Sequence, residues 1–178
     1  MLKFIGAVVV LAIVAVVVVL VIASTKPATF RVQRSITINS SPQQVGALIN
    51  DFHNWDAWSP WAHLDPTMKT TYSGPASGVG SVYEWEGNSK VGQGRMEILA
   101  TQPTDTTIKL DFLKPFEGHN TTDFILVPEG TATRVDWVMV GPMALFPGKV
   151  MSVFTTMDKM IGPDFEKGLA KMKATAEK

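Results

Sequence analysis

The feature that most constrains this chain is an apolar run from Phe4 to Ala23, twenty residues without a charge and without Asn, Gln or Pro. At about 1.5 Å per residue, a helix of that length spans roughly 30 Å, the thickness of a bilayer's hydrocarbon core. Its many valines lower helix propensity in water, whereas in lipid a helix is the way for one segment to satisfy its own backbone groups. The run therefore predicts a single-pass membrane helix.

A cleaved signal peptide is an alternative interpretation of the same run. Lys3 and the amino terminus supply a positive start, and Val21-Ile22-Ala23 is a weak match to a cleavage site. The apolar stretch is long for a signal peptide and of the right length for a span. A buried core helix is a third interpretation, against which the valine content argues.

Two signals conflict on which side of the membrane the rest of the chain lies. Counting Lys26, Arg31 and Arg34 after the run against Lys3 before it places the domain in the cytoplasm. The arginines alternate with apolar residues, as they do in a strand of a folded domain, and a short basic tail before a long apolar run is typical of an uncleaved export signal. We expect an extracytoplasmic domain, and the cytoplasmic alternative stays open.

Composition predicts two parts, an anchor over residues 1–26 and one domain over residues 27–178. About 150 residues suffice for one core and are too few for two domains. The chain has 16 basic and 16 acidic residues and no Lys/Arg-rich run, so we expect no nucleic-acid partner. It has no cysteine, which excludes disulfides and thiolate chemistry. Pro27 resists continuation of the helix, so the domain should lie close to the membrane.

Alternation of apolar and polar residues predicts seven strands. The first, over residues 30–38, is followed by a short helix with Ser41 as N-cap and Pro42 at its first position, and then by a turn-rich segment over residues 51–65. Short turns separate the other six strands, which should therefore form an antiparallel meander. These six are expected at residues 68–72, 80–85, 92–101, 106–113, 120–127 and 131–140.

A final apolar stripe predicts a long C-terminal helix. Gly162-Pro163 is expected to kink this helix or split it in two, because a proline removes a backbone hydrogen bond. The helix is the only large partner for the apolar face of the meander, so the order predicts an α+β fold in which a curved sheet grips one long helix. The stripe consists of Val150, Phe154, Met157, Ile161, Phe165, Leu169 and Met172.

Several short sequence motifs follow one another along the domain in an order that is typical of one fold. They are residues 34–38 followed by Ser41-Pro42, residues 54–61, Gly92-Gln93-Gly94, Gly130-Thr131 leading to Val135-Asp136-Trp137, and residues 164–169. In this order they resemble the helix-grip fold of the START-like (SRPBCC) superfamily, specifically its bacterial polyketide cyclase/dehydrase-like members. The resemblance is specific for fold and poorly specific for function, since it implies lipid and sterol carriers, polyketide cyclases or co-chaperone-like modules.

Strand alternation also predicts which side chains face the helix. We expect a large cavity rich in aromatic residues and methionine, suited to a hydrophobic ligand, although the same residues would serve a collapsed core. Trp55 and Trp58 should cap the open end of the sheet or lie at the cavity mouth. The predicted ligand-binding residues are Trp55, Trp58, Tyr83, Trp85, Leu110, Phe112, Phe124, Trp137, Met139, Phe154, Met157 and Ile161.

Signals for catalysis are sparse. His53, His63 and His119 lie in or beside turns, where a histidine is more often exposed than catalytic, and Arg95 and Glu97 share a strand face as an expected ion pair. The sequence has no nucleophile elbow, phosphate loop or metal-spaced His/Glu cluster, so we expect no cofactor and no metal. The cyclases of the resembled superfamily need few diagnostic residues, so an enzyme is not excluded.

These observations predict a membrane-tethered carrier or sensor that binds a hydrophobic small molecule, a lipid or a polyketide-like compound, between sheet and helix. Two alternatives stay open. One is a cyclase- or dehydratase-type enzyme that uses the same cavity, which a buried His or Asp pointing into the cavity would favour, whereas an all-apolar lining would favour the carrier. The other is a protein-interaction module, which a filled cavity and an exposed apolar patch would favour.

Overall fold

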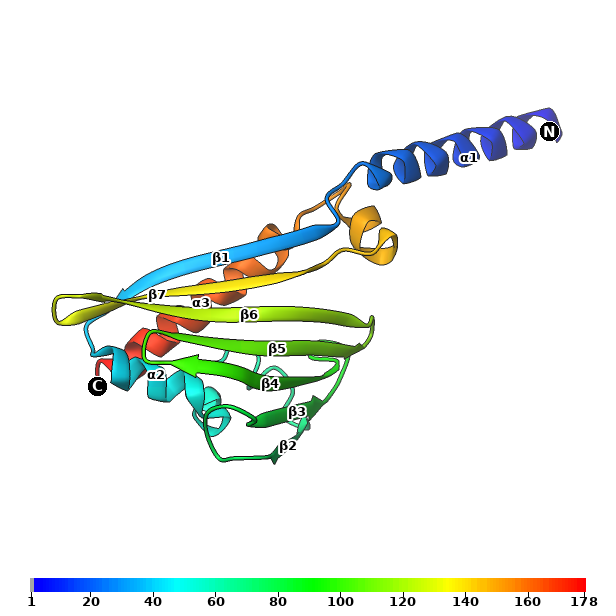
Figure 1. The fold of residues 1–178 in the computed structure, drawn as a ribbon. Coiled ribbons are helices and arrows are strands. Elements are labelled where there is room, and N and C mark those ends of the chain that lie inside the picture. Colours follow the sequence, from blue (N-terminus) through cyan, green and yellow to red (C-terminus); the bar gives the residue numbers. More distant parts are fainter. Residues whose placement is uncertain (1) are drawn as a thin grey trace.

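A seven-stranded antiparallel sheet and a long C-terminal helix form the domain, from which helix α1 (Leu2–Ser24) projects (Figure 1). This computed structural model describes residues 2–178, with side chains from Phe4 onward. The positive start assigned to the Lys3 side chain and the amino terminus therefore lies outside the part of the chain that the structure describes. The predicted α+β helix-grip architecture is confirmed.

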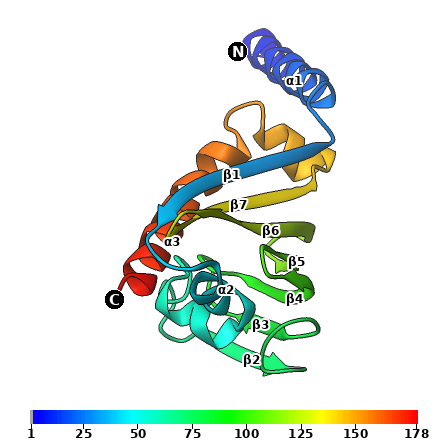
Figure 2. The same cartoon turned by 60° about the vertical axis from the view of Figure 1, so that its left-hand side comes forward.

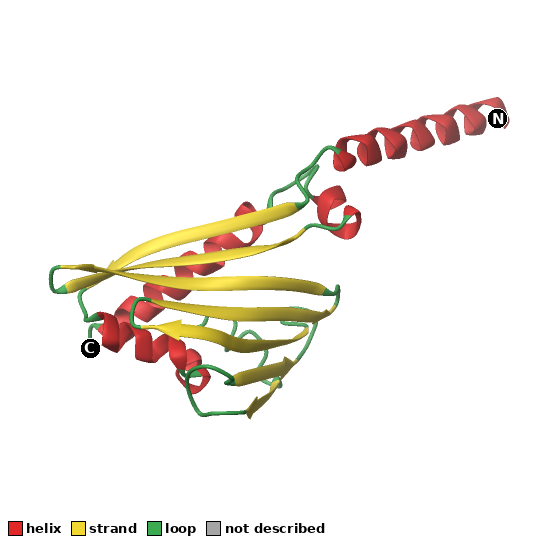
Figure 3. Cartoon of the chain, viewed as in Figure 1, coloured by secondary structure: helices red, strands yellow, loops and turns green. Residues whose placement is uncertain are grey.

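The strands follow the spatial order β1-β7-β6-β5-β4-β3-β2 (Figure 3). Strands β2 to β7 form the predicted meander, and β1 pairs with β7, so the first and last strands of the chain are neighbours. Every predicted strand is present within a few residues of its expected bounds. The strands are β1 (Thr29–Ile38), β2 (Lys69–Ser73), β3 (Val82–Glu86), β4 (Gln93–Gln102), β5 (Asp105–Lys114), β6 (Gly118–Glu129) and β7 (Ala132–Pro142).

Helix α2 (Pro42–Asn50) begins at the predicted cap. The Ser41 hydroxyl accepts from the Gln44 amide at 3.3 Å, and the Gln44 side chain accepts from the Ser41 amide at 3.2 Å. This reciprocal pair satisfies two backbone donors at the helix start. At the other end, the indole N–H groups of Trp55 and Trp58 donate to the carbonyls of Ile49 and Leu48, each at 2.9 Å. Trp55, in the short helical turn η1 (Phe52–Ala57), and Trp58 thereby fix the segment that follows α2.

Helix α3 (Met157–Ala176) is continuous through Pro163, so of the two predicted outcomes, a kink or a split at Gly162-Pro163, the split is wrong. The proline is the seventh residue, and the Thr156 hydroxyl caps the helix start by accepting from the Lys159 amide at 3.2 Å. Burial of Phe165, Leu169 and Met172 holds the rest of the helix against the domain. One lost backbone bond near a helix end is a smaller effect than this packing.

An arginine on β1 clamps the first half of α3. The Arg34 guanidinium binds Asp158 at 2.7 Å and Glu166 at 2.6 Å, carboxylates two turns apart on the helix. Gly162 lies between them, and a Cβ there would overlap the guanidinium. The hydrogen bonds from Arg34 also hold the pKa of Asp158 below its ordinary value. Strand and helix are therefore joined by charge as well as by apolar packing (Figure 2 shows α3 passing behind β1).

The centre of the core is a stack of aromatic rings across β6, β7 and α3. Trp137 lies face to face with Phe165 at a centroid distance of 3.9 Å and with Phe124 at 5.0 Å. Its indole N–H donates to the Thr122 hydroxyl at 2.9 Å, so the buried polar atom is satisfied. Gly168 on α3 has no side chain to hold the helix away from the Trp137 ring. This stack fixes how closely α3 approaches the sheet.

Replacing Trp137 with alanine should therefore lower the free energy of unfolding by about 3–5 kcal/mol, the usual cost of truncating a buried aromatic residue. Thermal unfolding of the full chain in mild detergent, followed by near-ultraviolet circular dichroism, measures this loss. The exposed Leu99→Ala substitution on β4 is the control. A loss for Trp137→Ala no larger than that of the control would contradict the central role of the stack.

Candidate functional site

A cavity of about 510 Å³ opens between β2 to β5, the segment over residues 52–70, and the first half of α3. Its volume lies within the range of roughly 300–1,000 Å³ that small-molecule sites occupy. Most of its lining is apolar or aromatic, as expected for a hydrophobic ligand. These side chains are Phe52, Trp55, Trp61, Ala62, Pro66, Met68, Tyr72, Tyr83, Trp85, Val91, Met96, Leu110, Phe112, Met139 and Ile161.

The space between sheet and helix is thus divided into a filled part and an open part. The filled part surrounds Trp137 and contains buried side chains from α2, β6, β7 and α3. The open part lies toward β2 to β5. The two alternatives of the sequence analysis, a cavity and a collapsed core, each describe one part of the interior.

Seven of the twelve predicted ligand-binding residues line the cavity: Trp55, Tyr83, Trp85, Leu110, Phe112, Met139 and Ile161. Trp58, Phe124 and Trp137 lie instead in the filled core, and Met157 packs against it. The expectation that Phe154 faces the sheet is wrong, since its side chain is 76 % exposed. The physical reason is that α3 begins at Met157, so Phe154 does not share the helical stripe.

The structure adds lining residues that the sequence analysis did not assign to the site, including Phe52, Trp61, Met68, Tyr72 and Met96. Strand alternation could have assigned Met96 to the cavity. It pairs with Tyr83 on one side and Leu110 on the other, and so shares their face of the sheet. Phe52, Trp61 and Met68 lie in the irregular segment before β2, where no period assigns a face.

A second row of residues across β3, β4 and β5 positions the Trp85 indole, which forms part of the cavity wall. Trp85 pairs with Gly94, which pairs with Phe112, and a bulge lies between Gln93 and Gly94. A Cβ on Gly94 would overlap the Trp85 ring and lie 2.5 Å from the Asp111 carbonyl oxygen. The glycine therefore leaves room for the indole, which meets the Phe112 ring edge-on at 5.8 Å. A glycine inside a strand often marks such a bulge, where the strand bends.

Asp65 organises one part of the cavity rim. Its carboxylate accepts from the Asn88 amide at 2.7 Å, from the Thr67 amide at 2.9 Å and from the Thr67 hydroxyl at 2.8 Å. These bonds, that from Asn88 foremost, lower the pKa of Asp65. They join the loop before β2 to the β3–β4 turn, which carries the lining residues Lys90 and Val91.

The charged groups of the lining lie in the segment before β2, in the β3–β4 turn and on α3, and two phenols lie on β2 and β3. The lining includes Asp56, His63, Asp65, Lys90 and Asp164. The side chain of His63 is 65 % exposed, and its Nε2 lies 3.2 Å from the Asp56 carbonyl oxygen. Burial raises the pKa of Tyr83 to about 12 and also raises that of Tyr72, so both phenols stay neutral.

The other titratable candidates form local pairs and are not themselves among the residues that line the cavity. His53 binds Asp51 at 2.7 Å and stacks on Tyr72, and His119 binds Asp111 at 2.8 Å. Arg95 and Glu97 form the expected ion pair at 2.7 Å. Among the side chains described, from Phe4 to Lys178, no three metal-binding groups gather as a site. The geometry of the cavity favours binding an apolar molecule over acid–base chemistry.

Gly94→Ala should displace Trp85 and shrink the cavity, because the new methyl group and the indole cannot share the space. We expect lower stability, since the methyl group also meets backbone, together with an altered Trp85 environment. Near-ultraviolet circular dichroism and thermal unfolding measure both effects. A variant with the spectrum and melting temperature of the wild type would contradict the assigned role of Gly94.

Asp65→Asn should make stability less sensitive to acid. A carboxylate whose pKa is lowered on folding stabilises the fold above its ordinary value of 3.8, and this contribution is lost as pH falls through the lowered pKa. We therefore expect a lower melting temperature at neutral pH and a smaller further fall toward about pH 3. Melting curves of wild type and variant across that range measure this. Parallel pH dependences would contradict the role of the Asp65 carboxylate.

The family model and the solved structures that match this chain agree with the fold described above. Residues 29–177 match a family model described as polyketide cyclase / dehydrase and lipid transport. No curated protein sequence matches the chain.

The solved structures that match are distant in sequence. Protein CV1439 from Chromobacterium violaceum is 16 % identical with a TM-score of 0.59, covering 86 % of this chain and 99 % of that one. The KanY protein is 15 % identical with a TM-score of 0.61, covering 85 % and 100 %. StfQ, a di-domain ARO/CYC from the steffimycin biosynthetic pathway, is 10 % identical with a TM-score of 0.62, covering 84 % of this chain and 51 % of that one. At these identities the likeness concerns the fold alone.

Proposed function

We propose that this chain, which belongs to the polyketide cyclase/dehydrase and lipid transport family, holds a hydrophobic small molecule, a lipid or polyketide-like compound, in its cavity. The observation that carries the proposal is a cavity of about 510 Å³ lined mainly by aromatic and apolar side chains, next to a core that is otherwise closely filled. A methionine-containing lining such as that of Met68, Met96 and Met139 adapts to ligands of different shape.

Desolvation is the driving force in this proposal. A ligand that buries about 300 Å² of apolar surface gains roughly 7.5 kcal/mol at 25 cal/mol per Å², before the cost of ordering ligand and protein. The binding free energy that remains after this cost is modest, as reversible binding of an exchanged ligand requires. The neutral phenols of Tyr72 and Tyr83 are available as hydrogen-bond partners for one polar group on the ligand.

Helix α1 serves in this proposal as a single-pass membrane anchor, and residues 27–178 form the binding domain. Phe4–Ser24 has a mean hydropathy of 3.5 and lies outside the core, a profile that a signal sequence would share. Four residues, 25–28, separate α1 from β1, so an anchored domain lies at the bilayer surface. We place the domain on the extracytoplasmic side, because a short basic tail before a long apolar run is typical of an uncleaved export signal.

A cyclase- or dehydratase-type reaction is the second candidate function. Its supporting observation is His63, which lies against Asp56 and lines the cavity that Asp164 also lines. Histidine titrates near neutral pH and is the most frequent general acid or base. Its exposed position at the rim makes it a weaker argument than the apolar interior, which supports binding without chemistry.

The binding proposal is tested by replacing one lining residue with a larger one that occupies part of the cavity. Met96→Trp should reduce ligand occupancy several-fold, because the larger side chain takes the space between Tyr83 and Leu110. The test uses the full chain in lipid nanodiscs and a diazirine-bearing fatty acid, with mass spectrometry of the photolabelled peptides. Peptides that contain lining residues should be labelled in the wild type and much less in the variant.

Leu99→Trp is the matched control, because Leu99 lies on the same strand and is exposed. It should leave the photolabelling of cavity peptides unchanged. Equal labelling of these peptides in Met96→Trp and Leu99→Trp would contradict a ligand site in the cavity.

A further inference from the structure

Exposed apolar side chains gather at the end of the domain from which α1 emerges. Phe146, Phe154 and Phe116 are 72 %, 76 % and 54 % exposed. Single exposed apolar residues are normal on a protein, whereas a group that includes three phenylalanines marks an interaction surface. We call this group the apolar lip and define it as Phe116, Leu145, Phe146, Met151 and Phe154.

Two ordered segments build the apolar lip. One is the β7–α3 connection over residues 143–156, which contains the helical turn η2 (Leu145–Lys149), and the other is the β5–β6 turn. The rings of Phe116 and Phe146 meet edge-on at a centroid distance of 6.5 Å, so the two segments touch. Backbone bonds such as Lys149 N–H to the Ala144 carbonyl, at 2.9 Å, hold the connection in turns. The rings are therefore presented by a defined backbone.

The apolar lip is continuous with the base of α1. Helix α1 contacts η2, and Ala23 near its end is fully buried. The Met143 amide donates to the Ala28 carbonyl at 2.7 Å, which ties the start of the β7–α3 connection to the short linker after α1. Figure 1 shows the connection beside the point where α1 leaves the domain.

We propose that the apolar lip inserts into the surface of the same bilayer that α1 spans, so that the domain docks on lipid rather than swinging from its anchor. This inference rests on the proposed function in taking α1 as a membrane anchor. Aromatic rings favour the membrane–water interface, and short apolar elements sink into it to the depth of the headgroup boundary. Lys149 is the only charged residue of the segment over residues 143–156, so little charge opposes burial of its apolar side chains in the interface.

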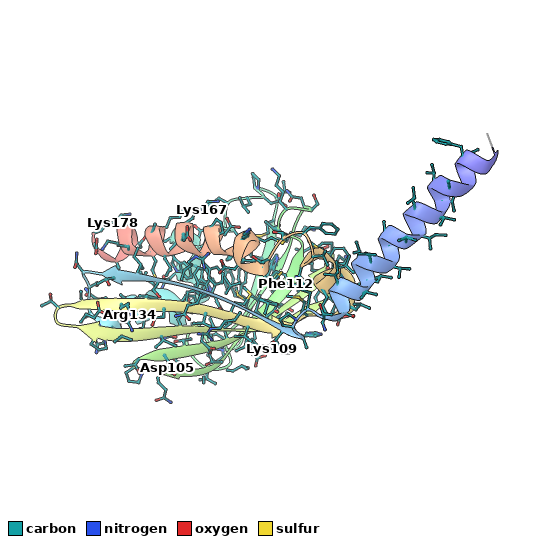
Figure 4. The ribbon with its side chains drawn as sticks, turned by 90° about the horizontal axis from the view of Figure 1, so that it is seen from above. Asp105, Lys109, Phe112, Arg134, Lys167 and Lys178 are labelled. Carbon is teal, nitrogen blue, oxygen red and sulfur yellow. The ribbon has the colours of Figure 1, made fainter. Side chains whose placement is uncertain are left out.

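Docking through the apolar lip would bring the cavity to the membrane. Phe112 lines the cavity and lies on β5 four residues before Phe116, and Ile161 lines it on α3, which begins just after Phe154. Figure 4 places Asp105, at the start of β5, away from α1 and Phe112 toward it. Two walls of the cavity thus lead into the apolar lip. The ligand class that fits this placement is an amphiphile resident in the bilayer.

The chain has no cysteine, so single-cysteine variants report one position each. Phe146→Cys in the full chain, labelled with the fluorophore NBD and reconstituted in phosphatidylcholine/phosphatidylglycerol vesicles, tests the apolar lip. We expect a blue-shifted emission and strong quenching by doxyl-labelled lipid, at a depth of roughly 5–10 Å below the headgroups. Phe154→Cys is the second variant and should behave in the same way.

Two controls give the test its contrast. Thr131→Cys lies in the exposed β6–β7 turn, roughly 35 Å along β7 from the apolar lip, and should not be quenched by lipid. Val14→Cys lies in the middle of α1 and should be quenched deeply. Quenching at residue 14 without quenching at residues 146 and 154 would overturn docking and leave the anchor intact.

Absence of lipid quenching at all three positions would overturn both the docking and the anchor. A label at residue 146 that is shielded from aqueous iodide, is not quenched by lipid and cross-links to a second copy would also overturn the proposal, because the apolar lip would then be a protein interface. The photolabelling of the cavity is independent of these results.

Discussion

The stacking of Trp137 against Phe165 is the contact on which the rest of the domain depends. At 3.9 Å and nearly parallel, these rings set the distance between α3 and the strands β6 and β7. Gly168 allows that approach, and the Arg34 clamp fixes the first half of the helix on β1. With α3 held at this side of the sheet, one helix cannot also cover β2 to β4.

The cavity is a consequence of that arrangement. The sheet curves away from α3 toward β2, and the segment over residues 52–68 closes the gap with loops and short turns instead of a second long helix. Loops fill space less completely than a packed helix, so a volume of about 510 Å³ stays open beside a filled core. Gly94 contributes locally, because the Trp85 indole occupies the space that a side chain at this position would take.

Much of the fold could be predicted from the sequence because its signals are periodic. Alternation locates every strand, the short turns imply the meander, and the stripe from Val150 to Met172 locates α3, although the helix begins only at Met157. Site residues on central strands, such as Leu110 and Phe112, followed from the same alternation. Phe154 did not, since an apolar residue at helical spacing before the true helix start is indistinguishable from one inside it. The distinction between Trp137 in the core and Tyr83 on the cavity depends on where α3 lies across the sheet, which no local pattern records.

A membrane anchor, an apolar lip at its base and a cavity whose walls lead into that lip would together suit exchange of a bilayer-resident molecule. The most direct measurement is native mass spectrometry of the full chain released from nanodiscs made with lipids of its own host, followed by organic extraction. The account predicts a population that carries one apolar ligand per chain and a lipid or polyketide-like compound in the extract. A chain that remains free of ligand in such membranes, and after added fatty acid, would contradict the account.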